Sequence, residues 1–155
     1  MASKIGIASD HAGKELKQLI ADFVRLKNFE VIDYGVSAGS DKSVDYPDYA
    51  AILATDVSSG KLDRGVLICG TGIGMCMTAN KFPGVRAASV WDEFTARMSR
   101  AHNDANIICL GARVLNHHRA AELVNLWLDT AFEGNRHKAR LDKIREIEKQ
   151  LHFSR

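Results

Sequence analysis

The stretch that decides the fold class is residues 65–74, GVLICGTGIG. Residues 66–69 are apolar at every position, as expected for a strand that helices cover on both faces of a parallel sheet. The glycine-rich residues 70–74 follow at once and lead toward a helix. An apolar strand that passes through a glycine turn into a helix indicates a doubly wound α/β domain.

The same pattern continues on both sides of this stretch. Four more short apolar runs rich in Ile and Val predict strands at residues 4–8, 30–34, 85–90 and 106–110. Between the runs lie stripes with i, i+3, i+4 spacing, which predict amphipathic helices. The clearest stripes are Leu16, Leu19, Ile20, Phe23 and Val24, and Leu123, Val124, Trp127, Leu128 and Ala131.

Length and composition fit one such domain, over residues 1–155. Of the 155 residues, 46% are apolar and 26% are charged, which is the usual balance of a packed chain. A last amphipathic helix is expected at about residues 136–151, with no strand after it. Because such an appended helix often packs on a partner subunit, we expect it at a dimer interface. Its apolar side holds Leu141, Ile144, Ile147 and Leu151.

Charge and cysteine usage exclude several classes of protein. The 21 Lys and Arg against 19 Asp and Glu lack the basic surplus of a nucleic-acid binder. The three cysteines form no Cys-x-x-Cys pair and there is no His-x-x-x-His, so neither a disulfide framework nor a metal site is expected. The longest uncharged stretch, residues 65–80, is too short to span a membrane. We expect a cytoplasmic protein that binds neither nucleic acid nor membrane.

In open parallel sheets, ligands bind beyond the carboxyl ends of the strands, so the residues after each apolar run are candidates for the site. These residues are small and polar here: SDHAG at 9–13, GTGIG at 70–74 and GAR at 111–113. The fourth helix is expected to finish with AHND at 101–104. The four segments can meet in one pocket.

The glycine turn is suited to an anion. Its three glycines let backbone N–H groups point inward at a helix N-terminus, where an oxyanion or phosphate is favoured. The turn lacks the ending of a Walker loop, and Met75 stands where the dinucleotide fingerprint has a third Gly or Ala. Asp92 lies 20 residues past Gly72, which leaves nucleotide binding open as an alternative.

Cys69 ends the strand directly before this turn. A helix N-terminus can lower the pKa of a nearby thiol from about 8.5 toward about 7, which makes thiolate available. An inert core cysteine is the alternative for Cys69, and it is our interpretation of Cys76 and Cys109.

The other candidates also have two interpretations each. Asp10 can cap a helix and leave His11 solvated in the first turn. Residues 102–104 can be an ordinary helix end, where Asn suits a left-handed cap. Three arginines either lie solvated or form a multidentate phosphate clamp: Arg113, Arg136 and Arg140.

Six motifs in this order closely resemble those of ribose-5-phosphate isomerase type B, in the wider group that includes galactose-6-phosphate isomerase. They cover nearly the whole chain: residues 9–13, 45–50 (DYPDYA), 69–74, 102–106 (HNDAN), 111–113, and Arg136-His137 with Arg140. The resemblance implies a Rossmann-like five-stranded sheet in three α/β/α layers. It also implies a homodimer or dimer of dimers, no metal or organic cofactor, and the interconversion of ribose 5-phosphate and ribulose 5-phosphate in the pentose phosphate pathway.

The resemblance further implies a role for each residue. Some members carry a carboxylate base after the turn; residues 74–76 are Gly-Met-Cys here, so Cys69 is implied as the base that moves the proton from C2 to C1. Thr71 would assist proton exchange between the oxygens, and His102 would open the furanose ring. The backbone of Gly70, Gly72, Ile73 and Gly74 would stabilise the enediolate, Asp10, Tyr46 and Asn103 would hold hydroxyls, and His11, Arg113, Arg136 and Arg140 would hold the phosphate. The family's habit of building each site across a twofold axis assigns Cys69 to one subunit and His102 to its neighbour.

Two alternatives remain open. The same chemistry on a hexose 6-phosphate, such as allose or galactose 6-phosphate, would require a pocket with room for one more carbon. A non-catalytic module that binds phosphosugars or nucleotides would leave Cys69 and His102 without a task.

Overall fold

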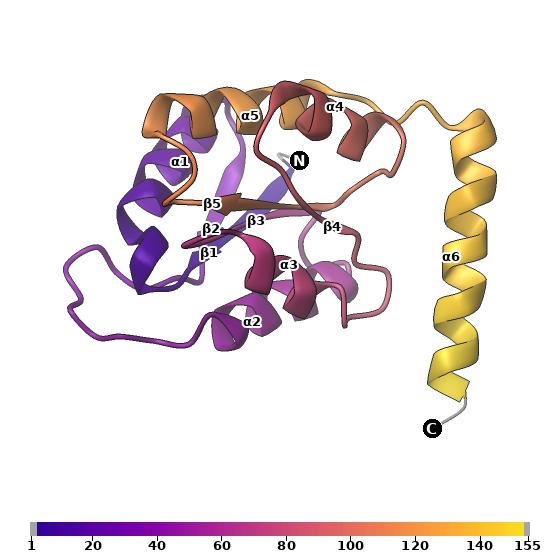
Figure 1. Ribbon diagram of the computed structural model, residues 1–155, viewed down its shortest axis with the longest axis horizontal. Coiled ribbons are helices and arrows are strands. Elements are labelled where there is room, and N and C mark those ends of the chain that lie inside the picture. Colours follow the sequence, from indigo (N-terminus) through magenta and orange to yellow (C-terminus); the bar gives the residue numbers. More distant parts are fainter. Residues whose placement is uncertain (1–2, 154–155) are drawn as a thin grey trace.

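The computed structural model describes residues 3–153, with side chains through residue 151. Its five strands form one parallel sheet in the order β2-β1-β3-β5-β4 (Figure 1). Each strand lies within about two residues of the apolar run that predicted it, so the five-stranded parallel sheet is confirmed. The strands are β1 (Lys4–Ser9), β2 (Glu30–Asp33), β3 (Arg64–Cys69), β4 (Ala87–Ser89) and β5 (Ile107–Gly111).

Helices cover both faces of the sheet and form the predicted three layers (Figure 1). They are α1 (Lys14–Leu26), α2 (Tyr46–Ser58), α3 (Ile73–Ala79), α4 (Glu93–Ala101), α5 (His117–Asp129) and α6 (Asn135–Phe153), with a 3-10 turn η1 (His11–Gly13) before α1. One core, which includes Val66 and Ile68 of β3, lies under α1, α4 and α5. The other includes Leu67 and Cys69 and lies under α2 and α3. Because alternate residues of β3 enter opposite cores, the strand is apolar throughout.

The register of the central strands brings their carboxyl ends level with one another. Ser9 of β1 pairs with Ile68, and Cys69 of β3 pairs with Gly111 of β5. The residues that follow these three strands therefore leave the sheet at one edge, side by side.

The last helix, α6, extends along one side of the molecule and away from the sheet (Figure 1). Of its predicted apolar side only Leu141 is buried, whereas Ile144, Ile147 and Leu151 are 51%, 58% and 65% exposed. Together with Val85 and its neighbours they line a groove of about 670 Å³. The helix is confirmed, and its contact with a partner subunit stays a prediction. None of the helices in the part of the chain described here has the length and apolar character needed to cross a membrane.

Candidate active site

The first group of candidate residues lies at the carboxyl edge of the sheet, around the glycine turn. The segment after β1 is joined to β3 because the N–H of Asp10 donates to the carbonyl of Ile68 at 3.2 Å. The segment after β5 is joined to the turn because the N–H of Arg113 donates to the carbonyl of Gly70 at 3.0 Å. Three of the four segments expected to meet therefore do so.

Cys69 is buried at the point where β3 enters the turn. Its Sγ accepts a hydrogen bond of 3.2 Å from the N–H of Gly72. Gly72 caps α3 in the left-handed region, with φ of 80°, and a Cβ there would lie 3.0 Å from the backbone carbonyl carbon of Leu110. The turn is thus packed against β5 in a shape that only glycine adopts easily, and that shape directs a backbone N–H at the thiol.

Asp10 and His11 are fixed by local contacts next to this turn. The carboxylate of Asp10 accepts from the N–H of Ala12 at 2.9 Å, which is the helix cap that one of the two interpretations expected. Nδ1 of His11 lies 3.1 Å from the carbonyl oxygen of Val44, in the polar connection before α2. His11 is therefore held by that connection and is not a freely solvated residue.

Three exposed or half-exposed side chains surround the buried thiol. Tyr46, at the start of α2, packs so closely on the turn that a Cβ on Gly74 would lie 2.5 Å from its ring. The guanidinium of Arg113 lies over Gly70, where a Cβ would be 3.3 Å from Nη1. Thr71 is exposed at the tip of the turn. The glycine turn thus has the thiol of Cys69 before it, the phenol of Tyr46 packed on Gly74 and the cation of Arg113 over Gly70.

His102 and Asn103 lie at the opposite edge of the sheet. His102 caps the C-terminus of α4, and the loop after it returns to the start of β5, where the carbonyl of Asn106 accepts from the N–H of Gly65 at 2.8 Å. Gly65 stands at the beginning of β3 and Cys69 at its end. Within one chain the fourth segment therefore lies apart from the other three, because a helix between parallel strands carries the chain back to the amino edge. A pocket that joins all four segments stays a prediction.

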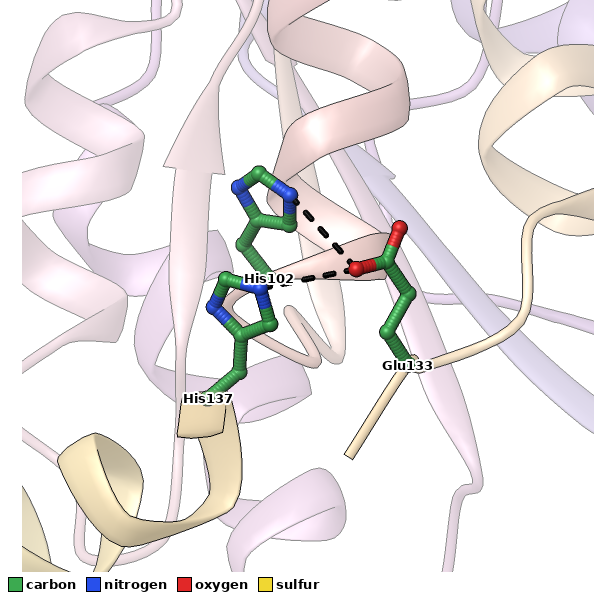
Figure 2. A group of neighbouring side chains, drawn as sticks. All are labelled: His102, Glu133 and His137. Carbon is green, nitrogen blue, oxygen red and sulfur yellow. Dashed lines mark ion pairs between the residues drawn. The ribbon is translucent and has the colours of Figure 1, made fainter. Parts of the chain in front are cut away.

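The second group gathers around His102 at this edge (Figure 2). The ring of His102 stacks on that of His137 of α6, with centroids 4.0 Å apart and planes 11° apart. Oε2 of Glu133 lies 3.8 Å from Nε2 of His102 and 3.4 Å from Nε2 of His137. Nε of Arg136 donates to Nε2 of His137 at 3.4 Å, and Arg140 is exposed one turn further along α6.

Burial, with the positive charges of His102, Arg136 and Arg140, holds the pKa of His137 below its ordinary value, against an upward effect of Glu133. Glu133 was not among the residues selected from the sequence, because it lies in the connection between α5 and α6, which carries no motif. His137 was noticed only as a neighbour of Arg136.

His102, Glu133 and His137 also form a group that was not expected from the sequence. Their possible ligand atoms all lie within 4.8 Å of one another, and two imidazoles with a carboxylate are ligands that zinc uses in proteins. No His-x-x-x-His pattern marks this cluster in the sequence, because its members come from two helices and a loop. Stacked rings direct their nitrogen lone pairs side by side, whereas a shared ion needs lone pairs that converge.

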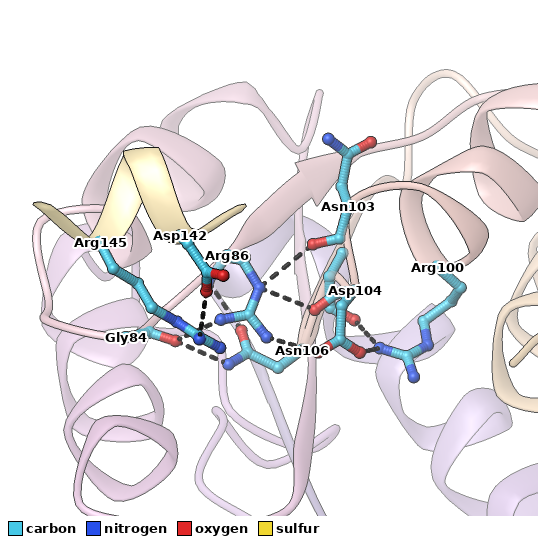
Figure 3. Close-up of polar contacts among 9 residues, drawn as sticks. Gly84, Arg86, Arg100, Asn103, Asp104, Asn106, Asp142 and Arg145 are labelled. Carbon is cyan, nitrogen blue, oxygen red and sulfur yellow. Dashed lines mark hydrogen bonds and ion pairs between the residues drawn. The ribbon is translucent and has the colours of Figure 1, made fainter. Parts of the chain in front are cut away.

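Asn103 is presented by a fixed loop (Figure 3). Nε of Arg86 donates to the carbonyls of Asn103 and Asp104 at 3.1 and 2.9 Å, and the carboxylate of Asp104 accepts from Arg100 at 2.8 Å. Asp104, not Asn103, takes the left-handed conformation, with φ of 44°. The side-chain amide of Asn103 points away from this network and is exposed. It is free to face a ligand while its backbone is held.

Cys76 of α3 and Cys109 of β5 differ from the sequence-based interpretation in one respect. A hydrogen bond from Cys109 lowers the pKa of Cys76 to about 6, with further help from Ser89 and Asn80. Burial raises the pKa of Cys109 well above its ordinary value. Cys109 fits an inert core thiol, whereas Cys76 is half-buried and favours the thiolate. This contact between α3 and β5 left no local signal in the sequence.

The sequence signature of the family described as Ribose/Galactose Isomerase matches residues 5–144. The chain belongs to the ribose/galactose isomerase family. Among solved structures of this family, ribose-5-phosphate isomerase B of Clostridium thermocellum is 51% identical, with a TM-score of 0.92 over 96% of this chain and 99% of that one. Its likeness confirms the three-layer fold with the appended C-terminal helix.

Two further relatives of this isomerase family differ in the substrate that their names give. Ribose-5-phosphate isomerase B of Mycoplasma genitalium, solved with bound ribulose 5-phosphate, is 44% identical, with a TM-score of 0.91 over 96% of this chain and 98% of that one. A protein of Pectobacterium atrosepticum described as D-erythrulose-4-phosphate isomerase is 42% identical over 94% of this chain and 95% of its own length. The names of these two relatives thus give two different sugar phosphates.

Proposed function

We propose that the protein is an aldose-ketose isomerase that interconverts D-ribose 5-phosphate and D-ribulose 5-phosphate. The observation that carries the proposal is the buried thiol of Cys69 at the start of a rigid glycine turn, with the N–H of Gly72 directed at its sulfur. The ribulose 5-phosphate bound to the Mycoplasma genitalium relative supports this sugar as the ligand. A place in the pentose phosphate pathway follows from these two sugars.

The proposed reaction moves one proton between neighbouring carbons. Cys69, as thiolate, removes the proton from C2 of the open-chain aldose, and the electron pair flows toward the carbonyl to give an enediolate. The backbone amides of residues 70–74 stabilise the negative oxygen, and Thr71 exchanges the proton between the two oxygens. The thiol then returns its proton to C1, which yields the ketose. Because this chemistry transfers only protons, the proposal includes no metal and no organic cofactor.

The two groups of residues at opposite edges support a site shared by two chains. The carboxyl edge supplies Cys69 with Asp10, His11, Tyr46 and Arg113, and the amino edge supplies His102 and Asn103 with Arg136 and Arg140. Either group alone lacks half of the chemistry that the family resemblance implies. We infer that in a homodimer, or a dimer of dimers, the amino-edge group of one subunit completes the carboxyl-edge group of the other.

The exposed apolar side of α6 is consistent with such an assembly. Ile144, Ile147 and Leu151 border an open groove, and burying side chains of this kind against a second subunit would stabilise a dimer. We place the protein in the cytoplasm, since its three free cysteines suit a reducing compartment.

The name of the Pectobacterium atrosepticum relative gives a shorter sugar phosphate, so the number of carbons in the substrate is the property to test. A coupled assay offers ribose 5-phosphate, allose 6-phosphate, galactose 6-phosphate and D-erythrulose 4-phosphate in parallel, each with a metal chelator. We expect the highest kcat/KM with ribose 5-phosphate, unchanged by the chelator. Preference for a six-carbon sugar would move the proposal to the hexose alternative, and no turnover of any sugar would leave a non-catalytic binding module.

A further inference from the structure

Glu133 is the charged residue of the amino-edge group that the proposed mechanism does not use. Its N–H donates to the carbonyl of Ala101, the last residue of α4, at 3.0 Å. The next two residues, Gly134 and Asn135, have φ of 68° and 47°, and this left-handed pair turns the chain directly into α6. The backbone thus places Glu133 between the end of α4 and the start of α6, and its half-exposed carboxylate lies beside both imidazoles (Figure 2).

The two stacked imidazoles cannot both be in the imidazolium form at low cost. Two cations 4.0 Å apart repel each other, so one ring of the pair stays neutral. The side chain of His137 is 5% exposed, and its Nε2 accepts from Arg136, which requires a free lone pair on that nitrogen. His137 is therefore the neutral ring, as the lowered pKa of this residue also indicates.

His102 is the more exposed ring of the pair. Its side chain is 35% exposed, and its Nε2 lies 3.8 Å from the carboxylate of Glu133. The same carboxylate oxygen lies 3.4 Å from Nε2 of His137, so Glu133 faces both rings. Glu133 is thus the negative charge that lies next to the exposed ring of His102.

The same contacts argue against a metal ion in this cluster. An ion would need the lone pair of Nε2 of His137, which Arg136 occupies, and it would bring two positive charges next to that guanidinium. The rings would also have to leave their parallel stack. The arrangement suits a carboxylate that supports an imidazolium better than it suits a metal site.

We propose that Glu133 is a positioning residue for ring opening: its carboxylate orients the ring of His102 and pairs with it while it donates a proton. This inference rests on the proposed function. His102 donates its proton to the ring oxygen O4 as the C1–O4 bond breaks, and the electron pair of that bond goes to O4. The hydroxyl on C1 becomes the aldehyde and releases its proton to water. Glu133 stays ionised throughout.

The consequence depends on the direction of the reaction. Ribose 5-phosphate enters as a closed furanose, whereas ribulose 5-phosphate is open, because its O5 carries the phosphate. In Glu133→Gln we expect kcat for ribose 5-phosphate to fall about tenfold, since the closed ring still binds but rarely opens. We expect kcat for ribulose 5-phosphate to stay within about twofold of the parent. Both sugars are assayed with a chelator present.

The matched control is Glu122→Gln. Glu122 also lies beside a histidine, with Oε1 3.5 Å from Nδ1 of His118, but on the exposed surface of α5. It should match the parent in both directions. A second readout uses ribose 5-phosphate deuterated at C2: its isotope effect on kcat should approach unity in Glu133→Gln, because ring opening, and not C–H cleavage, then limits turnover.

Equal loss of kcat in both directions with an unchanged isotope effect would assign Glu133 a merely structural role and overturn the inference. A Glu133→Gln enzyme that matches the parent in both directions would also overturn the inference. Both results presuppose an active parent, so they leave the proposed isomerase function intact. A parent that turns over neither sugar instead overturns the proposed function and this inference with it.

Discussion

Cys69 is the residue on which the proposed chemistry depends most. Its sulfur accepts a hydrogen bond from the N–H of Gly72, so its position is fixed before any substrate arrives. A base fixed in this way loses little entropy on reaching the reactive geometry. The phosphate contacts proposed for His11 and Arg113 come from other segments, and the chemical and binding roles can therefore be separated by mutation.

Replacing Cys69 with alanine should abolish isomerisation and leave phosphosugar binding largely intact, because the thiol acts on a proton and the phosphate clamp lies elsewhere. Turnover and calorimetric binding of ribose 5-phosphate are measured on the same samples. Cys76→Ala is the control, since it removes a thiol from the same side of the sheet. Activity of Cys69→Ala within tenfold of the parent would exclude Cys69 as the base.

Cys76 should react with iodoacetamide faster than Cys109. Its pKa of about 6 makes it largely thiolate at pH 7, and its alkylation rate should fall as the pH drops from 7 to 5. Cys109 is buried with a raised pKa and should label only on unfolding. Peptide mass spectrometry follows both sites. A rate at Cys76 that rises only between pH 8 and 9 would show an ordinary thiol.

At the scale of elements, the glycine turn joins fold and function. Gly72 has φ of 80° and faces the backbone of Leu110, whereas Gly60 has φ of 74° and a Cβ there would have nothing within 4 Å. Both positions penalise alanine by about 1–2 kcal/mol through the left-handed backbone. Only Gly72 adds a contact with backbone that cannot move aside.

Gly72→Ala should therefore lose more stability than Gly60→Ala in urea unfolding, and its kcat should fall at least about tenfold because the N–H directed at Cys69 is displaced. Gly60→Ala should keep kcat within about twofold of the parent. Equal kcat in the two variants would mean that the shape of the turn does not matter for the reaction.

The start of α6 should act on substrate binding. Arg136→Ala and Arg140→Ala should each raise KM for ribose 5-phosphate, because each removes a charge-assisted hydrogen bond of about 1.5–3 kcal/mol. Arg145→Ala, further along the same exposed helix and paired with Asp142, is the control and should leave KM unchanged. If KM is unchanged in the first two variants, Arg136 and Arg140 belong to a solvated basic face and do not bind the phosphate.

The sequence predicted those features that depend on neighbouring residues. Strands and helices followed from apolar runs and periodic stripes, and Cys69 followed from a strand end before a glycine turn. The edge at which His102 lies depends instead on the direction in which α4 runs relative to the strands. Glu133 reaches His102 only through the left-handed turn at Gly134 and Asn135, which no motif marked.

At the scale of the whole molecule, the central claim is that one site uses two chains. Cys69 and His102 belong to opposite edges of one sheet, so a single chain presents two half-sites. In a twofold dimer each subunit meets the other through the same surfaces, and two complete sites arise at once. An exchange of defects between subunits can therefore restore one site of the two.

The most direct test is to co-refold equal amounts of Cys69→Ala and His102→Ala chains and to measure isomerase activity with ribose 5-phosphate, the sugar towards which each variant alone should be inactive. In a mixed dimer one site carries both defects and the other carries neither. Random pairing makes about half of the dimers mixed, with half of their sites sound, so about a quarter of parental activity should return. If mass spectrometry finds mixed dimers and no activity returns, Cys69 and His102 do not act in a site shared between subunits.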